Sequence, residues 1–197
     1  MKKISILLIA ILFLFATNVS AKIIPAEKEG WNTFIDEKSG LMIDFPDFFE
    51  VEQVSNSRDI HLSGNKDSFY VGVIISFLKE DVNYPENANY FNDEQFKAFE
   101  EYLLKTKLNS TENTGYKFLK IGDIYQEGMR GARIAKYRTI NGKTTLEVSC
   151  FYISHKELIE INILNTVASD KKLNDYVIKE FIAPIGVSIR FNYLKNK

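Results

Sequence analysis

The sequence predicts an α+β sandwich in which two main helices cover a mainly antiparallel sheet of about seven strands. Two tight turns in the second half of the chain place three consecutive strands in one antiparallel register. Two segments with helical periodicity each carry a single apolar stripe, so each needs a sheet face to cover. Short apolar runs before the first helix and after the second complete the pattern.

The first 21 residues are unlike the rest of the chain. Two lysines precede an apolar run over residues 4–16, and small residues at 19–21 precede Lys22. A basic start, a short apolar core and a small-residue cleavage site are typical of a secretory signal peptide. The run is shorter than the roughly 20 residues that span a bilayer, and no later segment reaches that length. We therefore expect residues 1–21 to be removed and the protein to be exported, soluble and periplasmic or extracellular.

The remaining chain is expected to form one domain over residues 31–194, after a flexible lead-in at 22–30. No repeat, low-complexity tract or Pro-rich linker divides it. Runs rich in β-branched and aromatic residues predict strands in its first half. These strands are expected at residues 31–35, 41–45, 48–54, 60–62 and 69–78.

Two amphipathic helices are expected, one before and one after the later strands. Asn92 is a suitable N-cap for the first, and Gln95 completes a capping box. Ser169 is expected to cap the second, and Pro184 to end it before a last strand at 187–191. The apolar stripes are Phe96, Phe99, Leu103, Leu104 and Leu108 in the first helix, and Leu173, Tyr176, Val177 and Phe181 in the second.

A three-stranded meander is predicted from about Met129 to Leu164. Asn141-Gly142 is a preferred type I′ hairpin pair, and a second turn is expected around residues 154–157. Both turns leave the same sheet face mostly apolar, while the other face sets Lys136 opposite Glu147. The pairs expected on the apolar face are Tyr137 with Leu146, Ala135 with Val148, Arg133 with Cys150, Cys150 with Ile161, and Val148 with Ile163.

The composition argues against several classes of chemistry. A net charge of −1 disfavours a nucleic-acid binder, and a single cysteine excludes a disulfide framework or a multi-cysteine metal site. Cys150 is expected on the apolar sheet face and His155 at a turn, out of reach of one another. His61 and His155 lack metal-ligand spacing. We therefore expect no catalytic residue, no metal, no cofactor and no enzymatic activity. A hydrolase with an unrecognised site stays a further alternative, because distant carboxylates can meet in space.

One segment, residues 81–92, has the composition of a recognition surface. Tyrosine and asparagine together are typical of surfaces that adapt to a partner. The alternative is an ordinary connection in which Tyr90 and Phe91 pack under the following helix. The candidate partner-binding residues are Tyr84, Asn87, Asn89, Tyr90 and Phe91.

Two segments resemble Mog1/PsbP-like domains, a family that includes a DcrB-like branch. At Trp31–Pro46 a short strand, a turn ending in Gly, a second strand and a Pro follow one another, and Ile185–Phe191 resembles the family's last strand. The resemblance implies an antiparallel sheet between helices, which is an α/β/α sandwich, and a non-enzymatic role. Members of the family serve as photosystem II extrinsic subunits, Ran-binding factors or bacterial envelope proteins. The signal peptide argues against a nuclear factor, and no binding motif matches residue by residue.

The sequence therefore predicts an exported, non-enzymatic envelope protein that binds a protein partner or supports an assembly. The alternative is a small-molecule or lipid carrier with a cavity between helix and sheet. These two hypotheses differ in where the binding surface lies, since a carrier needs an interior hollow and an assembly module needs an exposed face.

Overall fold

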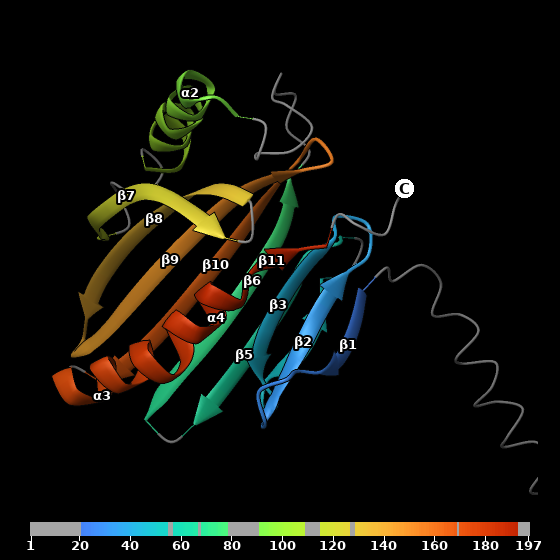
Figure 1. The fold of residues 1–197 in the computed structure, drawn as a ribbon. Helices are drawn as coiled ribbons and strands as arrows, with labels where there is room; N and C mark the ends of the chain where they lie inside the picture. Colours follow the sequence, from blue (N-terminus) through green and yellow to red (C-terminus); the bar gives the residue numbers. More distant parts are fainter. Residues whose placement is uncertain are drawn as a thin grey trace, which may run out of the picture.

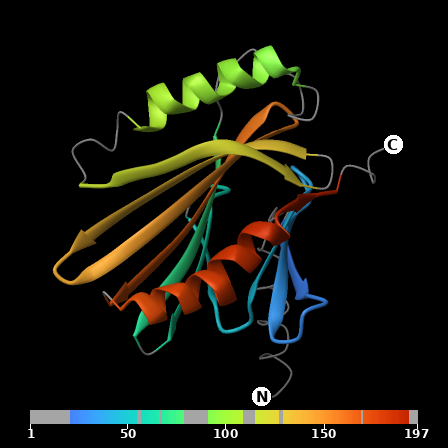
Figure 2. The ribbon, with the colours of Figure 1, turned by 60° about the vertical axis from the view of Figure 1, so that its left-hand side comes forward.

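The computed structural model describes residues 21–54, 57–66, 68–78, 91–108, 115–126, 129–168 and 170–192. These residues form three layers (Figures 1 and 2). Helix α2 (Asp93–Leu103) covers one face of a seven-stranded antiparallel sheet. A C-terminal helical segment and a second sheet of four strands cover the other face. The predicted sandwich with a large antiparallel sheet is confirmed, and the four-stranded sheet is an addition to it.

The seven-stranded sheet has the spatial order β4-β5-β6-β10-β9-β8-β7. The predicted meander register is confirmed at each predicted pair, including Arg133 opposite Cys150 and Cys150 opposite Ile161. Strand β7 was not expected, because it is an edge strand with a bulge near Phe118 and its described side chains are half-buried or exposed. The strands are β4 (Glu50–Gln53), β5 (Ile60–Lys66), β6 (Phe69–Leu78), β7 (Lys117–Gln126), β8 (Met129–Ile140), β9 (Lys143–Ser154) and β10 (Glu157–Ala168).

The smaller sheet has the order β1-β2-β3-β11. Its strands are β1 (Ala21–Pro25), β2 (Trp31–Asp36), β3 (Leu41–Pro46) and β11 (Arg190–Phe191). The prediction of a flexible lead-in at 22–30 is therefore wrong for residues 22–25, which belong to β1 and pair with β2. An edge strand with mostly exposed side chains needs no apolar pattern, since its backbone hydrogen bonds hold it in place.

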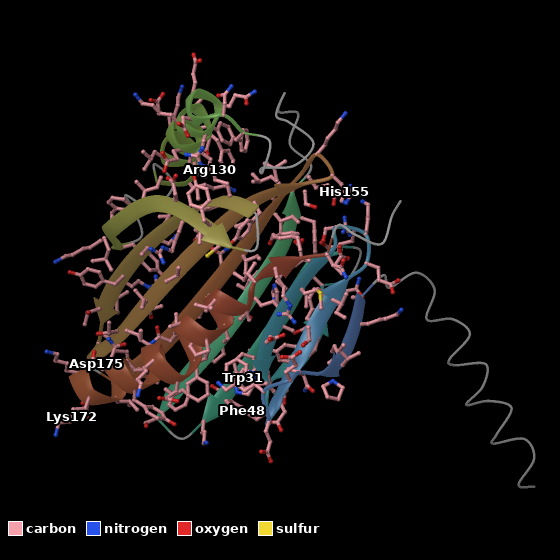
Figure 3. All side chains as sticks on the ribbon, viewed as in Figure 1. Trp31, Phe48, Arg130, His155, Lys172 and Asp175 are labelled. Carbon is pink, nitrogen blue, oxygen red and sulfur yellow. The ribbon has the colours of Figure 1, made fainter. Side chains whose placement is uncertain are left out.

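Helix α2 begins as the sequence predicts. The Asn92 side chain accepts a hydrogen bond from the Gln95 backbone at 2.8 Å, and the Gln95 side chain accepts one from the Asn92 backbone at 3.1 Å. A π-helical turn, η2 (Leu104–Leu108), continues the helix. Arg130 of β8 lies beneath α2 (Figure 3), with its guanidinium over the Phe96 ring at 3.9 Å and an ion pair to Asp93 at 2.9 Å. These contacts join α2 to the sheet.

The C-terminal helical segment comprises α3 (Lys171–Val177), a π-helical turn η4 (Ile178–Ile182) and α4 (Ala183–Ser188). Asp170 caps it, and Ser169 lies outside the described residues. The expectation that Pro184 ends the helix is wrong. The Ala183 amide donates a hydrogen bond to the Ile178 carbonyl, five residues earlier in the chain. Pro184 lies in the first turn of α4, where the missing backbone N–H of a proline is tolerated, so the helical segment continues past it. The last strand is consequently shorter than expected.

A charge cluster joins the two sheets. Arg58 pairs with Asp36 and with Glu157, each at 2.7 Å, and Lys38 also pairs with Glu157 at 2.6 Å. Burial alone would raise the pKa of Glu157, but the hydrogen bonds from Lys38 and Arg58 outweigh it and lower that pKa. The cluster holds β2 against the β9–β10 turn and so positions the smaller sheet over one part of the larger sheet.

Gly131→Ala is expected to lower the free energy of unfolding by about 1–3 kcal/mol. A Cβ at Gly131 would lie 2.5 Å from the Tyr152 ring and 2.9 Å from the Phe151 carbonyl oxygen. Gly186→Ala is the matched control, because its Cβ would meet Ile163 at an ordinary 3.6 Å. Urea unfolding followed by circular dichroism measures the free energy of unfolding of both variants. Unchanged stability of Gly131→Ala would contradict the packing of Tyr152.

Candidate functional site

A cavity of about 590 Å³ lies between the C-terminal helical segment and strands β7 to β10. This volume is within the range of roughly 300–1,000 Å³ that small-molecule sites occupy. The cavity has an apolar, buried floor made by Cys150, Ile163 and Ile182. Its walls are half-buried aliphatic side chains, namely Ile124, Leu146, Val148 and Ile178.

The rim of the cavity is exposed to solvent. Val187 has 73% of its surface exposed and Tyr125 has 68%, and both line the opening. Arg133 is also exposed, and it is the one charged residue among the described residues that line the cavity. Among the residues that the structure describes, the lining therefore changes from an uncharged interior to a rim with one cation.

The sheet register brings the floor and rim residues together. Arg133 lies opposite Cys150, and Val148 lies opposite Ile163, so the four side chains share one face of neighbouring strands. This is the apolar face that the sequence predicts for the meander. Arg133 interrupts that face with a charge, which the sheet places at the edge of the cavity.

The helical segment forms the opposite wall and is fixed near both of its ends. The Asn165 side chain of β10 donates to the Asn174 side chain of α3 at 3.3 Å. At the other end, the backbone amide of Asp44 in β3 donates to the Ser188 hydroxyl at 2.8 Å. The wall residues lie between these two contacts. Gly186 is among them, and its missing side chain leaves space over Ile163.

The chemistry of the floor is that of a neutral, buried thiol. Burial raises the pKa of Cys150 to about 12, and the nearby positive charge of Arg133 offsets this only in part. Burial likewise raises the pKa of Tyr152, the next residue on the same face of β9. Since the thiolate is the reactive form of cysteine, Cys150 is unreactive at neutral pH.

The structure does not bring a thiol–imidazole pair into this cavity. His155 is exposed at the β9–β10 turn (Figure 3), where its φ is 50°. Cys150, in contrast, is 3% exposed within β9. His61 is half-buried on β5. Within the described ranges, no group of three His, Cys, Asp or Glu residues is placed to hold a metal ion.

The proposed recognition loop is described only at its end. Tyr84, Asn87, Asn89 and Tyr90 lie outside the described residues, so their role stays a prediction. Phe91 is 7% exposed, and its ring stacks on Phe99 at 5.5 Å between centroids. This placement agrees with packing beneath helix α2, the alternative considered for that residue.

Comparison with known proteins supports the fold. Cyanobacterial PsbP from Synechocystis has a TM-score of 0.55 and 11% identity over 90% of this chain and 96% of its own. The chain has a PsbP-like fold. A Pseudomonas aeruginosa protein of unknown function matches at TM-score 0.44 and 13% identity, over 81% of this chain and 92% of its own. LpqN of Mycobacterium tuberculosis, which is involved in cell envelope biogenesis, matches at TM-score 0.44 and 10% identity, over 90% of this chain and 92% of its own.

No family model and no curated protein matches the sequence. At 11% identity, the match to cyanobacterial PsbP establishes the PsbP-like fold alone. In the part of the chain that the structure describes, every helix is too short or too polar to cross a lipid bilayer. The cavity must therefore be interpreted from its own residues.

The sequence analysis placed several of the cavity residues on the apolar sheet face but assigned no ligand-binding role to them. Val187 was expected to begin the last strand, because Pro184 was expected to end the helix. Arg133 could have been found, since the predicted register places a charge on an otherwise apolar face opposite Cys150.

Alkylation of Cys150 by iodoacetamide at pH 8 is expected to be about 1,000-fold slower in the folded protein than in urea. The reason is that burial raises the thiol pKa from 9.0 to about 12, which lowers the thiolate fraction. Mass spectrometry measures the rate, and the signal is specific because the chain has one cysteine. Equal rates in the folded and unfolded protein would contradict the buried floor.

Proposed function

We propose that this chain is an exported, non-enzymatic carrier that holds a small apolar molecule between its C-terminal helical segment and its main sheet. The observation that carries the proposal is the cavity of about 590 Å³ with a buried aliphatic floor. Apolar walls with a few polar groups at the edge are typical of small-molecule sites.

The arrangement favours storage of a ligand over chemistry on it. Burial keeps the Cys150 thiol of the lining protonated, and His155 is not among the described lining residues. A non-enzymatic role is the simplest function for such a site. The protein-binding or assembly module, which the sequence analysis placed first, has its candidate residues in the loop at 81–92, and most of that loop lies outside the described residues.

Export is supported by the signal-peptide pattern of residues 1–21. Strand β1 begins at Ala21, so cleavage after this residue would leave the other elements of the fold intact. The proposal thus places the carrier outside the cytoplasmic membrane, in the periplasm or beyond.

The expected mature N-terminus is Lys22. Expression of the full chain with a C-terminal tag in a bacterial host, followed by fractionation and intact-mass measurement, tests this. A protein recovered from the cytoplasm with residues 1–21 attached would contradict export.

Gly186→Leu is expected to abolish binding of linear alcohols, because the leucine side chain would occupy the space over Ile163. For the unmodified protein, titration calorimetry with octanol, nonanol and decanol should show affinity rising up to about fourfold per methylene, from about 0.8 kcal/mol per buried CH₂.

The matched control is Gly186→Ala, which adds one carbon at an ordinary contact distance and should retain binding. Absence of alcohol binding to the unmodified protein, or equal binding to Gly186→Leu, would refute the carrier proposal. Thermal unfolding of both variants shows whether the leucine variant is folded.

A further inference from the structure

We propose that the ligand is a single-chain amphiphile with an anionic head group, and that Arg133 binds this head at the mouth of the cavity. The inference rests on the proposed carrier function and specifies the class of ligand. Its basis is the position of Arg133 on the rim, where it is the one charged side chain among the described lining residues.

The interior of the cavity selects an uncharged chain. Cys150, Ile163 and Ile182 form a floor with no more than 5% of any residue exposed. Burial of a charge against such a surface without a partner is strongly unfavourable. The thiol supplies no compensating charge, since burial keeps it protonated. The part of a ligand that reaches the floor must therefore be apolar.

Arg133 differs from the other arginines. Arg58, Arg130 and Arg190 each form an ion pair with a carboxylate, at distances of 2.7 to 3.1 Å. Arg138 lies over the Tyr116 ring at 4.6 Å. Within the described part of the chain, no acidic residue pairs with Arg133. An anionic ligand would meet this guanidinium without displacing a described acidic side chain.

The position of Arg133 also fits the shape of an amphiphile. It is exposed, so a head group bound to it stays partly hydrated. It lies opposite Cys150 in the register, so a chain that starts at the guanidinium reaches the buried floor at once. Guanidinium groups bind carboxylate and phosphate oxygens in a two-point geometry, which orients the head at the rim and the chain inward.

Two kinds of molecule combine a single apolar chain with an anionic head group. They are free fatty acids, with a carboxylate head, and single-chain phospholipids, with a phosphate head. Decanoate, decyl phosphate and decanol, each below its micelle concentration, distinguish them by calorimetry on the full mature chain. We expect at least one anion to bind about tenfold or more tightly than decanol, because a charge-assisted pair adds to the same chain contacts. The anion that binds more tightly shows whether the head group of the ligand is a carboxylate or a phosphate.

Arg133→Gln is expected to remove the preference for the anion, so that this variant binds the anion no more tightly than it binds decanol. Arg133→Lys should retain part of the preference, since it keeps the charge without the two-point geometry. Arg138→Gln is the matched control, because this arginine lies on the same strand with its side chain over Tyr116.

The outcomes separate the inference from the function on which it rests. If decanol and the anions bind the unmodified protein equally, or if Arg133→Gln leaves anion binding unchanged, the head-group inference fails and the carrier function stands. If none of the three probes binds, the carrier function fails. A reduced anion affinity in Arg138→Gln equal to that in Arg133→Gln would point to net charge and would also overturn the assignment.

Discussion

The architecture depends on one constraint, which is that a single wide apolar sheet face has to be covered by two separate pieces of chain. Rows of buried side chains cross β5, β6, β10 and β9, such as the row of Ile60, Ile75, Ile161 and Cys150. The smaller sheet, tied to the β9–β10 turn by the Arg58 charge cluster, covers one part. The C-terminal helical segment contacts β10 and β3, and the space between it and the outer strands is the cavity.

The same constraint explains the polarity of the site. A face built to be buried carries aliphatic side chains, so a cavity that opens on it has apolar walls. Arg133 is tolerated on this face because it lies where the covering elements end and solvent begins. The helix α2 side is different, since Arg130 there is engaged by Asp93, Asp123 and the Phe96 ring. Arg130 and Arg133 are three residues apart on β8, so their side chains lie on opposite faces of the sheet.

Local chemistry made much of the fold predictable. Asn141 and Gly142 adopt φ of 50° and 70°, which a type I′ turn requires, and that turn alone sets the β8–β9 register. The Asn92 capping box likewise marks the start of α2. Strand β7 and the helix beyond Pro184 were missed, because bulged edge strands and π-helical turns have no strong local signal. The cavity was foreseen only as an alternative, since its volume depends on how the helix is held between Asn165 and Asp44.

The most direct test of the carrier account is methyl NMR of the isoleucine-labelled protein during titration with decanol. We expect shifts at the lining methyl groups of Ile163, Ile178 and Ile182, while Ile134 on the opposite face of the sheet stays unchanged. Saturable shifts confined to the lining residues would establish the cavity as the binding site. Unchanged lining methyl groups, or shifts centred on the α2 side of the sheet, would contradict the account.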